Sequence, residues 1–399
     1  MIPGPVSQSP VKIRRPAKWG KPVAIALFVI VLGGLGLLHV TPLSNTQYEN
    51  MASAAIGQPV KIGSVHLSVI TGVELKFEGI SIGENVRIAG ARAVPQIGTL
   101  FGDRKVFTHV SVEGLVVPQS GLATILSGSL KSDTLAVDRI TAPKAKLTGP
   151  IALPELDLDI ALAPSGAVSS VDFKSAETKL AGRVVPQADG AGIELSAGTL
   201  ALPFVPAISL SDFSMKGTFS GQEMALSAWS AKLYDGQLAG TARIRWGVRW
   251  TVEGDMRVRQ MNVSVLAPAL MSEGRADARG TFSMSGAPVD KLGAEARLDG
   301  SFAVGKGVLG SFSLARALQS PAGQATGRTE FSEMTGTGTY NKGTVQLRDM
   351  KLTAGLLTAS GAADIDAGER LSGRVNAELG GQRGTFTITG TSKEPQIRK

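Results

Sequence analysis

The chain has 399 residues, no cysteine, and 41 basic against 33 acidic side chains, which gives a formal net charge of +8. Without cysteine it can form no disulfides, no thiolate metal sites and no cysteine nucleophile. Hydrophobic residues make up 43% of the chain, aromatic residues only 5%, and there are 49 glycines, a balance typical of strands and turns. Five of the positive charges lie in the first 21 residues, so the remainder carries a small net charge that does not indicate a nucleic-acid-binding protein.

The N-terminal region combines a basic tail, residues 1–21, with the uncharged run PVAIALFVIVLGGLGLLHV at residues 22–40. At about 1.5 Å per residue this run is about 28 Å long, close to the roughly 30 Å hydrocarbon core of a bilayer. Because basic residues precede the run, the positive-inside rule predicts a single transmembrane helix with residues 1–21 in the cytoplasm and the bulk of the chain on the other side. The alternative is a cleaved signal peptide, although the run exceeds the ~7 to 15 residues of a typical apolar h-region.

Beyond residue 56 the dominant pattern is alternation of apolar and polar residues in short runs, which Gly, Pro, Ser or Asp interrupt about every 8 to 12 residues. This pattern predicts a mainly β fold, an elongated and curled antiparallel sheet with one apolar and one polar face. A few short helices are indicated at 43–55, 122–130, 263–271 and 312–318, and we expect them to cover apolar surface at the ends of the sheet.

The apolar face is either open as a trough or closed by a second sheet, and the sequence leaves both arrangements possible. The alternation is clearest in two runs, at 73–77 and 156–162, where every second residue is apolar. If the face is a groove, the residues that we expect to line it are Val73, Leu75, Phe77, Leu156, Leu158, Ile160 and Leu162.

Residues that could support catalysis are scattered along the chain. His39, His66 and His109 lie far apart, with no HExxH motif and no acidic pair at metal-ligand spacing. The segment GKGVLG at residues 305–310 fits G-x-G-x-x-G, but the hairpins around it lack the alternating strands and helices of a dinucleotide-binding fold. We therefore expect no enzyme activity, no cofactor and no metal site.

One basic and aromatic cluster has a candidate role in binding: Arg243, Arg245, Trp246, Arg249 and Trp250 lie close together in the sequence. One interpretation is a cross-strand ladder in which guanidinium groups stack on indole rings, each contact contributing about 0.5 to 1 kcal/mol at an exposed site. The other is a docking patch for anionic lipid head groups or a partner protein, since Trp and Arg are frequent in both kinds of interface.

Three segments after the apolar run, GQPVKIGSV (57–65), LFG (100–102) and VSVEGL (110–115), look like the N-terminal region of AsmA-like proteins. The second half is similar to the C-terminal region of that family. The segments that carry this similarity are QMNV (260–263), ARGTFSMSG (278–286), LDGSF (298–302), GVLG (307–310), TEFSEMTG (329–336), GAADI (361–365) and ITGTSKEP (388–395).

The resemblance implies a protein anchored in the cell inner membrane by one helix, with a periplasmic β groove that binds or conducts phospholipid acyl chains. Such a protein supports outer-membrane biogenesis and envelope integrity, and its partners are membrane phospholipid and an envelope protein. An alternative is an inner-membrane accessory subunit of an export machine, similar to the N subunit of type II secretion, which shares the single anchor and the β-rich periplasmic part.

The expected organisation has five parts, all of them inferred from the patterns and the resemblance above. They are the basic tail at 1–21, the transmembrane helix at 22–40, a connecting helix or linker at 41–56, and two β-rich AsmA-like regions at 57–245 and 246–399.

Overall fold

The structure is a computed structural model, and it describes residues 44–68, 73–83, 86–99, 103–119, 135–149, 151, 153–202, 208–320 and 326–399. The expected basic tail, the expected transmembrane helix and the expected helix at 122–130 lie outside these residues. Among the helices that are described, none has the length and apolar character needed to cross a bilayer.

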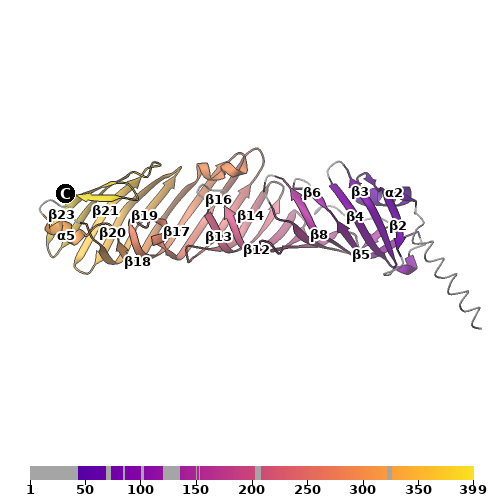
Figure 1. Cartoon of the computed structure of the whole chain (residues 1–399), viewed down its shortest axis with the longest axis horizontal. Helices are drawn as coiled ribbons and strands as arrows, with labels where there is room; N and C mark the ends of the chain where they lie inside the picture. The colour runs from indigo at the N-terminus through magenta and orange to yellow at the C-terminus, as the bar shows by residue number, and fades with distance from the viewer. Residues whose placement is uncertain are drawn as a thin grey trace, which may run out of the picture.

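All 24 strands in the described part of the chain belong to one long curled sheet (Figure 1). At the N-terminal end, two short strands lie one after the other along the same edge of a third strand, and two more strands follow in antiparallel order. In chain order these strands are β1 (Val60–Lys61), β2 (Ser64–Ser68), β3 (Glu74–Ile82), β4 (Val86–Pro95) and β5 (Lys105–Glu113).

A parallel join interrupts the antiparallel order that the sequence predicts. Strand β5 pairs in parallel with β7 (Leu135–Val137) and with β8 (Arg139–Thr148), and the short β6 (Val116–Pro118) also runs parallel to β8. Parallel neighbours need a crossover connection of about a dozen residues or more, and the chain between β6 and β7 is long enough to provide one. The expectation of an antiparallel sheet is therefore wrong at this point.

From β8 onward the sheet is an uninterrupted antiparallel meander in which each strand pairs with the next. The expected boundary between residues 245 and 246 falls in a turn of this meander, and the two strands beside it pair along their length. The strands are β9 (Leu156–Leu162), β10 (Val168–Ser175), β11 (Leu180–Gln187), β12 (Gly190–Leu202), β13 (Ile208–Ser220), β14 (Glu223–Leu233), β15 (Gly236–Arg245), β16 (Trp250–Asn262), β17 (Met271–Gly286), β18 (Arg297–Leu309), β19 (Thr329–Asn341), β20 (Thr344–Ala354), β21 (Leu357–Ile365), β22 (Leu371–Leu379), β23 (Gln382–Gly390) and β24 (Pro395–Arg398).

The turns of the meander form two long margins of the sheet. We call rim A the margin that holds the β13–β14 and β15–β16 turns, where the Trp246 amide donates to the Gln222 carbonyl at 3.0 Å. We call rim B the opposite margin, which holds the β14–β15 turn and the β16–β17 connection, where the Asn262 amide donates to the Tyr234 carbonyl at 2.9 Å. Two short helices, α4 (Val263–Leu266) and α5 (Leu314–Gln319), belong to rim B, and the 3-10 helix η3 (Val289–Glu295) belongs to rim A.

β-Bulges bend several strands, one of them close to rim B. Lys144, Gln260 and Asp349 each have a positive φ, and the strand register shifts at each of them. A bulge leaves one backbone group without its ladder partner. At two of these positions a carboxylate on the next strand accepts the hydrogen bond, from the Lys144 amide to Asp157 Oδ1 at 3.1 Å and from the Gln260 amide to Asp277 Oδ1 at 2.8 Å.

Helix α2 (Asn45–Ile56) lies against the free edge of β1 and supplies the hydrogen bonds that a further strand would make. The Ile62 amide donates to Glu49 Oε1 at 2.7 Å, the Val60 amide donates to Ser53 Oγ at 2.9 Å, and Asn45 Nδ2 donates to the Gly63 carbonyl at 2.8 Å. The three side chains are four residues apart and therefore share one face of the helix. The segment that we expected to be a connecting helix or linker thus protects an open sheet edge.

Helix α5 covers the apolar face at the C-terminal end of the sheet. Ala317 of this helix is completely buried, and Leu314 joins the same core cluster as Phe386 of β23 and Ile397 of β24. The Ser313 side chain caps the helix by accepting a hydrogen bond from the Arg316 amide. The expected short helices at 263–271 and 312–318 are thus present in part, as α4 and α5.

Removal of the Glu49 carboxylate is expected to open the edge that α2 protects. The Glu49→Ala variant leaves the Ile62 amide without its acceptor, a cost of about 1 to 3 kcal/mol for a buried donor. Hydrogen exchange of the Ile62 amide should therefore become roughly 5- to 150-fold faster, because opening of the α2–β1 contact becomes easier by that free energy. The Glu49→Gln variant keeps an acceptor at the same place and should exchange close to the wild-type rate; equal exchange in all three proteins would contradict the edge-protecting role of α2.

Candidate functional site

One row of apolar residues runs along the long axis of the sheet, with one member from each of its consecutive strands β8–β22. Each member pairs in register with the next, so all of them lie on the same face. At about 4.8 Å between strands the row is roughly 67 Å long. We call it the inner ladder, and its members are Ile140, Ile160, Val171, Val184, Ile193, Gly217, Leu226, Ala242, Gly254, Phe282, Leu298, Tyr340, Val345, Ile365 and Leu371.

Close approach of neighbouring strands places the inner ladder on the concave side of the curl. A Cβ atom at Gly254 would overlap the carbonyl oxygen of Thr241, and one at Gly240 would overlap that of Asp255. Side chains converge on the concave side of a bent sheet, so glycine at these two positions makes the curvature possible. The apolar face is therefore the inner face of the curled sheet.

The inner face is a single layer along the middle of the molecule. Each strand from β9 to β15 makes its extensive contacts with its hydrogen-bonded neighbours alone. Ladder members such as Ile193, Phe282 and Leu298 are only half-buried, and they belong to none of the buried core clusters found among the described residues. Over these strands the described part of the chain places no second sheet on the apolar face.

On β15 and β16 the inner face is buried toward rim B and half-exposed toward rim A. Near rim B the paired residues Leu238 and Val258 are 8% and 5% exposed. Near rim A the paired residues Ile244 and Val252 of the same two strands are only half-buried. Near rim B, α4 and the adjoining strand ends thus form a closed side with an apolar core, and on β15 and β16 the half-exposed strip lies along the other side.

The seven residues predicted to line a groove divide into core residues and members of the inner face. Leu75 is fully buried and Leu156 is 3% exposed, so both fill the core. Phe77 contacts Tyr48 of α2 edge to face, with ring centroids 5.5 Å apart, and Val73 packs in the same region. The remaining three, Leu158, Ile160 and Leu162, are half-buried on β9.

Sequence reasoning missed most of the exposed strip, which lies farther along the chain. Phe282 and Tyr340 are the largest members of the inner ladder, and they come from strands that also contribute glycines. The alternation at 250–258 was a usable signal for this strip. Glycine at positions such as Gly254 lowers the apparent hydrophobicity of the pattern, although glycine there is part of the apolar face.

The structure separates the predicted basic and aromatic cluster into two groups on different faces. On the polar face, Glu223 bridges Arg243 at 3.2 Å and Arg245 at 2.8 Å, while Arg249 pairs with Glu295 of η3. The arginine charges are thus largely balanced by carboxylates. The expected stacking of guanidinium groups on indole rings is wrong for Arg243 and Arg245, because their side chains lie on the opposite face of the sheet from the tryptophans.

The two tryptophans of the cluster lie at the margin of the apolar face. Trp250 lies two residues before Val252 on β16 and therefore on the same face of the sheet. Its ring centroid is 6.1 Å from that of Trp246, and the two ring planes are tilted by 31°. Both rings are half-buried at rim A.

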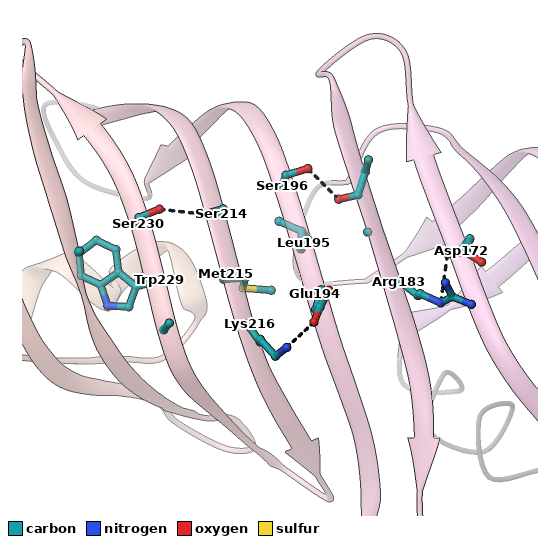
Figure 2. Close-up of a pocket in the computed structure, with 14 residues that line it drawn as sticks. Asp172, Arg183, Glu194, Leu195, Ser196, Ser214, Met215, Lys216, Trp229 and Ser230 are labelled. Carbon is teal, nitrogen blue, oxygen red and sulfur yellow. Dashed lines mark hydrogen bonds and ion pairs between the residues drawn. The ribbon is translucent and has the colours of Figure 1, made fainter.

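One depression among the described residues has a volume of about 710 Å³ and spans β10 to β15. Its four charged residues form pairs, Asp172 with Arg183 at 3.6 Å and Glu194 with Lys216 at 2.6 Å, and Figure 2 shows the members of each pair pointing toward one another. The hydrogen bond from Lys216 lowers the pKa of Glu194 below its ordinary value. Paired groups of this kind stabilise strand register and are poor general acids or bases at neutral pH.

Among the described residues, no group of three or more His, Asp or Glu side chains has the arrangement of a metal site. Comparisons with family models, with characterised proteins and with solved structures give no match to this chain. The resemblance to AsmA-like proteins therefore stays a prediction from the sequence.

The balance of charges around Glu223 predicts a pH-dependent contribution to stability. The hydrogen bond from Arg245 holds the pKa of the Glu223 carboxyl below its usual value, and the charge of Arg243 acts in the same direction. A carboxyl whose pKa is lowered by folding stabilises the fold above its unfolded pKa of about 4.3, and this contribution disappears as the pH falls through the folded pKa.

The melting temperature of the Arg245→Gln variant should therefore lie below that of the wild type at pH 7, and the difference should shrink toward pH 3. Arg259→Gln is a matched control, since it removes the same charge from the same face next to the neutral Gln237. A difference between wild type and Arg245→Gln that is independent of pH would show that the Glu223 interaction does not contribute to stability.

Proposed function

We propose that the protein binds or conducts phospholipid acyl chains in a trough formed by the curled sheet, as an inner-membrane anchored, periplasmic protein that supports outer-membrane biogenesis. The observation that carries this proposal is the inner ladder, an apolar row about 67 Å long in which buried members such as Leu226 alternate with half-buried members such as Ile193, Phe282 and Leu298. The AsmA-like resemblance and the predicted N-terminal anchor support the same function.

The half-exposed face is incomplete without an apolar ligand. Soluble proteins rarely expose a long continuous apolar surface, and such a surface marks a site of interaction with protein or lipid. Each methylene that leaves water contributes about 0.8 kcal/mol, so an acyl chain laid along the ladder gains most of the stabilisation that it has inside a bilayer. Movement of a chain between the bilayer and the trough then requires little net free energy.

The shape of the inner face matches an acyl chain better than a compact ligand. The face is continuous and runs along the long axis of the sheet (Figure 1). Its side chains are aliphatic or aromatic, and Tyr340 contributes the one side-chain polar atom of the inner ladder. A surface of this kind recognises hydrocarbon and leaves the polar head group in water.

An acidic side chain on the ladder is expected to abolish lipid binding. Ile193 is half-buried on β12, and the Ile193→Asp variant would place a carboxylate against the acyl chain. Burial of an unpaired polar group costs at least about 2 kcal/mol, which corresponds to a roughly 30-fold loss of affinity. Native mass spectrometry of the detergent-extracted full chain should show phospholipid bound to the wild type and little or none bound to the variant.

The matched control is Ser196→Asp, which adds the same charge to the exposed polar face of the same strand. It should bind lipid like the wild type, and circular dichroism should show that both variants keep the β-sheet signal. A wild-type protein without bound lipid, or an Ile193→Asp variant that binds as well as Ser196→Asp does, would overturn the proposal.

A further inference from the structure

Trp246 and Trp250 occupy a particular place on the inner face, at its boundary with water. They flank the β15–β16 turn at rim A, directly beyond the half-buried pair Ile244 and Val252. They are therefore the last large side chains of the apolar face before the turn, whose tip residue Val248 is 99% exposed. An aromatic pair thus stands where the open side of the sheet meets solvent.

A second aromatic pair lies deeper on the same face. The rings of Trp229 and Phe282 meet edge to face with their centroids 6.3 Å apart. Trp229 pairs with Gly240 of β15, and Phe282 pairs with Gly254 of β16. Because both partners are glycines, no side chain stands at either position between the two rings. Gly254 follows Trp250 by four residues on β16, so the second aromatic pair lies about 13 Å farther along the strand from rim A.

Indole rings have a known preference in lipid environments. They combine a large apolar body with one N–H donor, and they concentrate at the level of the head groups, where hydrocarbon meets water. The pair at rim A has this environment, with half-exposed apolar residues on one side and the polar network of Arg249, Ser285 and Glu295 on the other. Trp229 has a different environment, because its indole N–H already donates to the Thr241 carbonyl at 3.2 Å.

We infer that Trp246 and Trp250 form a portal on rim A that holds the glycerol region of a two-chain phospholipid, with its acyl chains running inward toward Trp229 and Phe282. This inference rests on the proposed function and adds the position and direction of the bound lipid. Because the nearby arginines are paired with Glu223 and Glu295, the portal has little net charge to select a head group. It therefore takes zwitterionic and anionic phospholipids alike.

The natural tryptophans make this arrangement directly measurable by fluorescence. The full chain in detergent, with Trp19→Phe as the common background, gives two reporter proteins. Trp229→Phe leaves the portal pair as the emitter, and the double variant Trp246→Phe and Trp250→Phe leaves Trp229. Each protein is loaded with phosphatidylcholine that carries bromine either next to the glycerol end of the chain or near its middle, since bromine quenches indole only at close range.

The portal reporter should lose most of its emission with the shallow bromine and little with the deep bromine. The Trp229 reporter should show the opposite order. A third protein, Val248→Ser in the same background, changes only the exposed tip and should take up lipid like the background protein, whereas replacement of both portal tryptophans by Ser should reduce the rate of uptake.

The outcomes separate the portal from the proposed function. Quenching of Trp229 without any depth-dependent quenching of the portal pair, or the reverse depth order, would overturn the portal and leave the lipid trough intact. An absence of quenching in both reporters would overturn both proposals together. Equal quenching of the two reporters by both lipids would also overturn the portal, because the chains would then have no fixed direction.

Discussion

Strand register is the constraint on which the rest of this structure depends. In a sheet, side chains alternate between faces, so a slip of one residue would transfer a whole strand from the apolar face to the polar face. The inner ladder keeps its face across fifteen consecutive strands, from Ile140 to Leu371, because each hairpin preserves the pairing of the one before it. Where a bulge shifts the register, a carboxylate such as Asp277 satisfies the backbone group that the bulge exposes.

The polar face contributes to register by a different interaction. Opposite charges stand next to one another on neighbouring strands, as in Arg139 with Asp159, Glu194 with Lys216, and Lys232 with Asp212. Each exposed pair contributes only about 0 to 1 kcal/mol. A slipped strand, however, would bring like charges together and expose the inner residues, so the two faces select the same pairing. This agreement matters in a single-layer sheet, where no second layer fixes the position of each strand.

Several features followed from the sequence because their cause is local. Alternation over six or so residues predicts a strand and its two faces, and it correctly placed Ile160 on the inner face and Asp159 on the other.

The features that were missed depend on residues far apart in the chain. The parallel join between β5 and β8 is set by a crossover, the edge contact of Glu49 is made with Ile62, and the division of Arg245 from Trp246 depends on which face each residue occupies at the end of a strand. Only part of the inner ladder could be predicted from the sequence. Some of its members are glycines, such as Gly254, which the curvature of the sheet requires and which an apolar pattern does not reveal.

The hairpin construction has a consequence for how such a chain can change in length. Each strand contributes one member to the inner ladder, so two added strands extend the apolar row by about 10 Å and leave every earlier and later pairing unchanged. A single added strand would reverse the direction of all that follow, and would exchange rim A with rim B for the rest of the molecule. Gain or loss of length is therefore tolerated in units of one hairpin. The reach of the protein can be adjusted by duplication of such a unit in the middle of the meander, with α2 and α5 retained as the two ends.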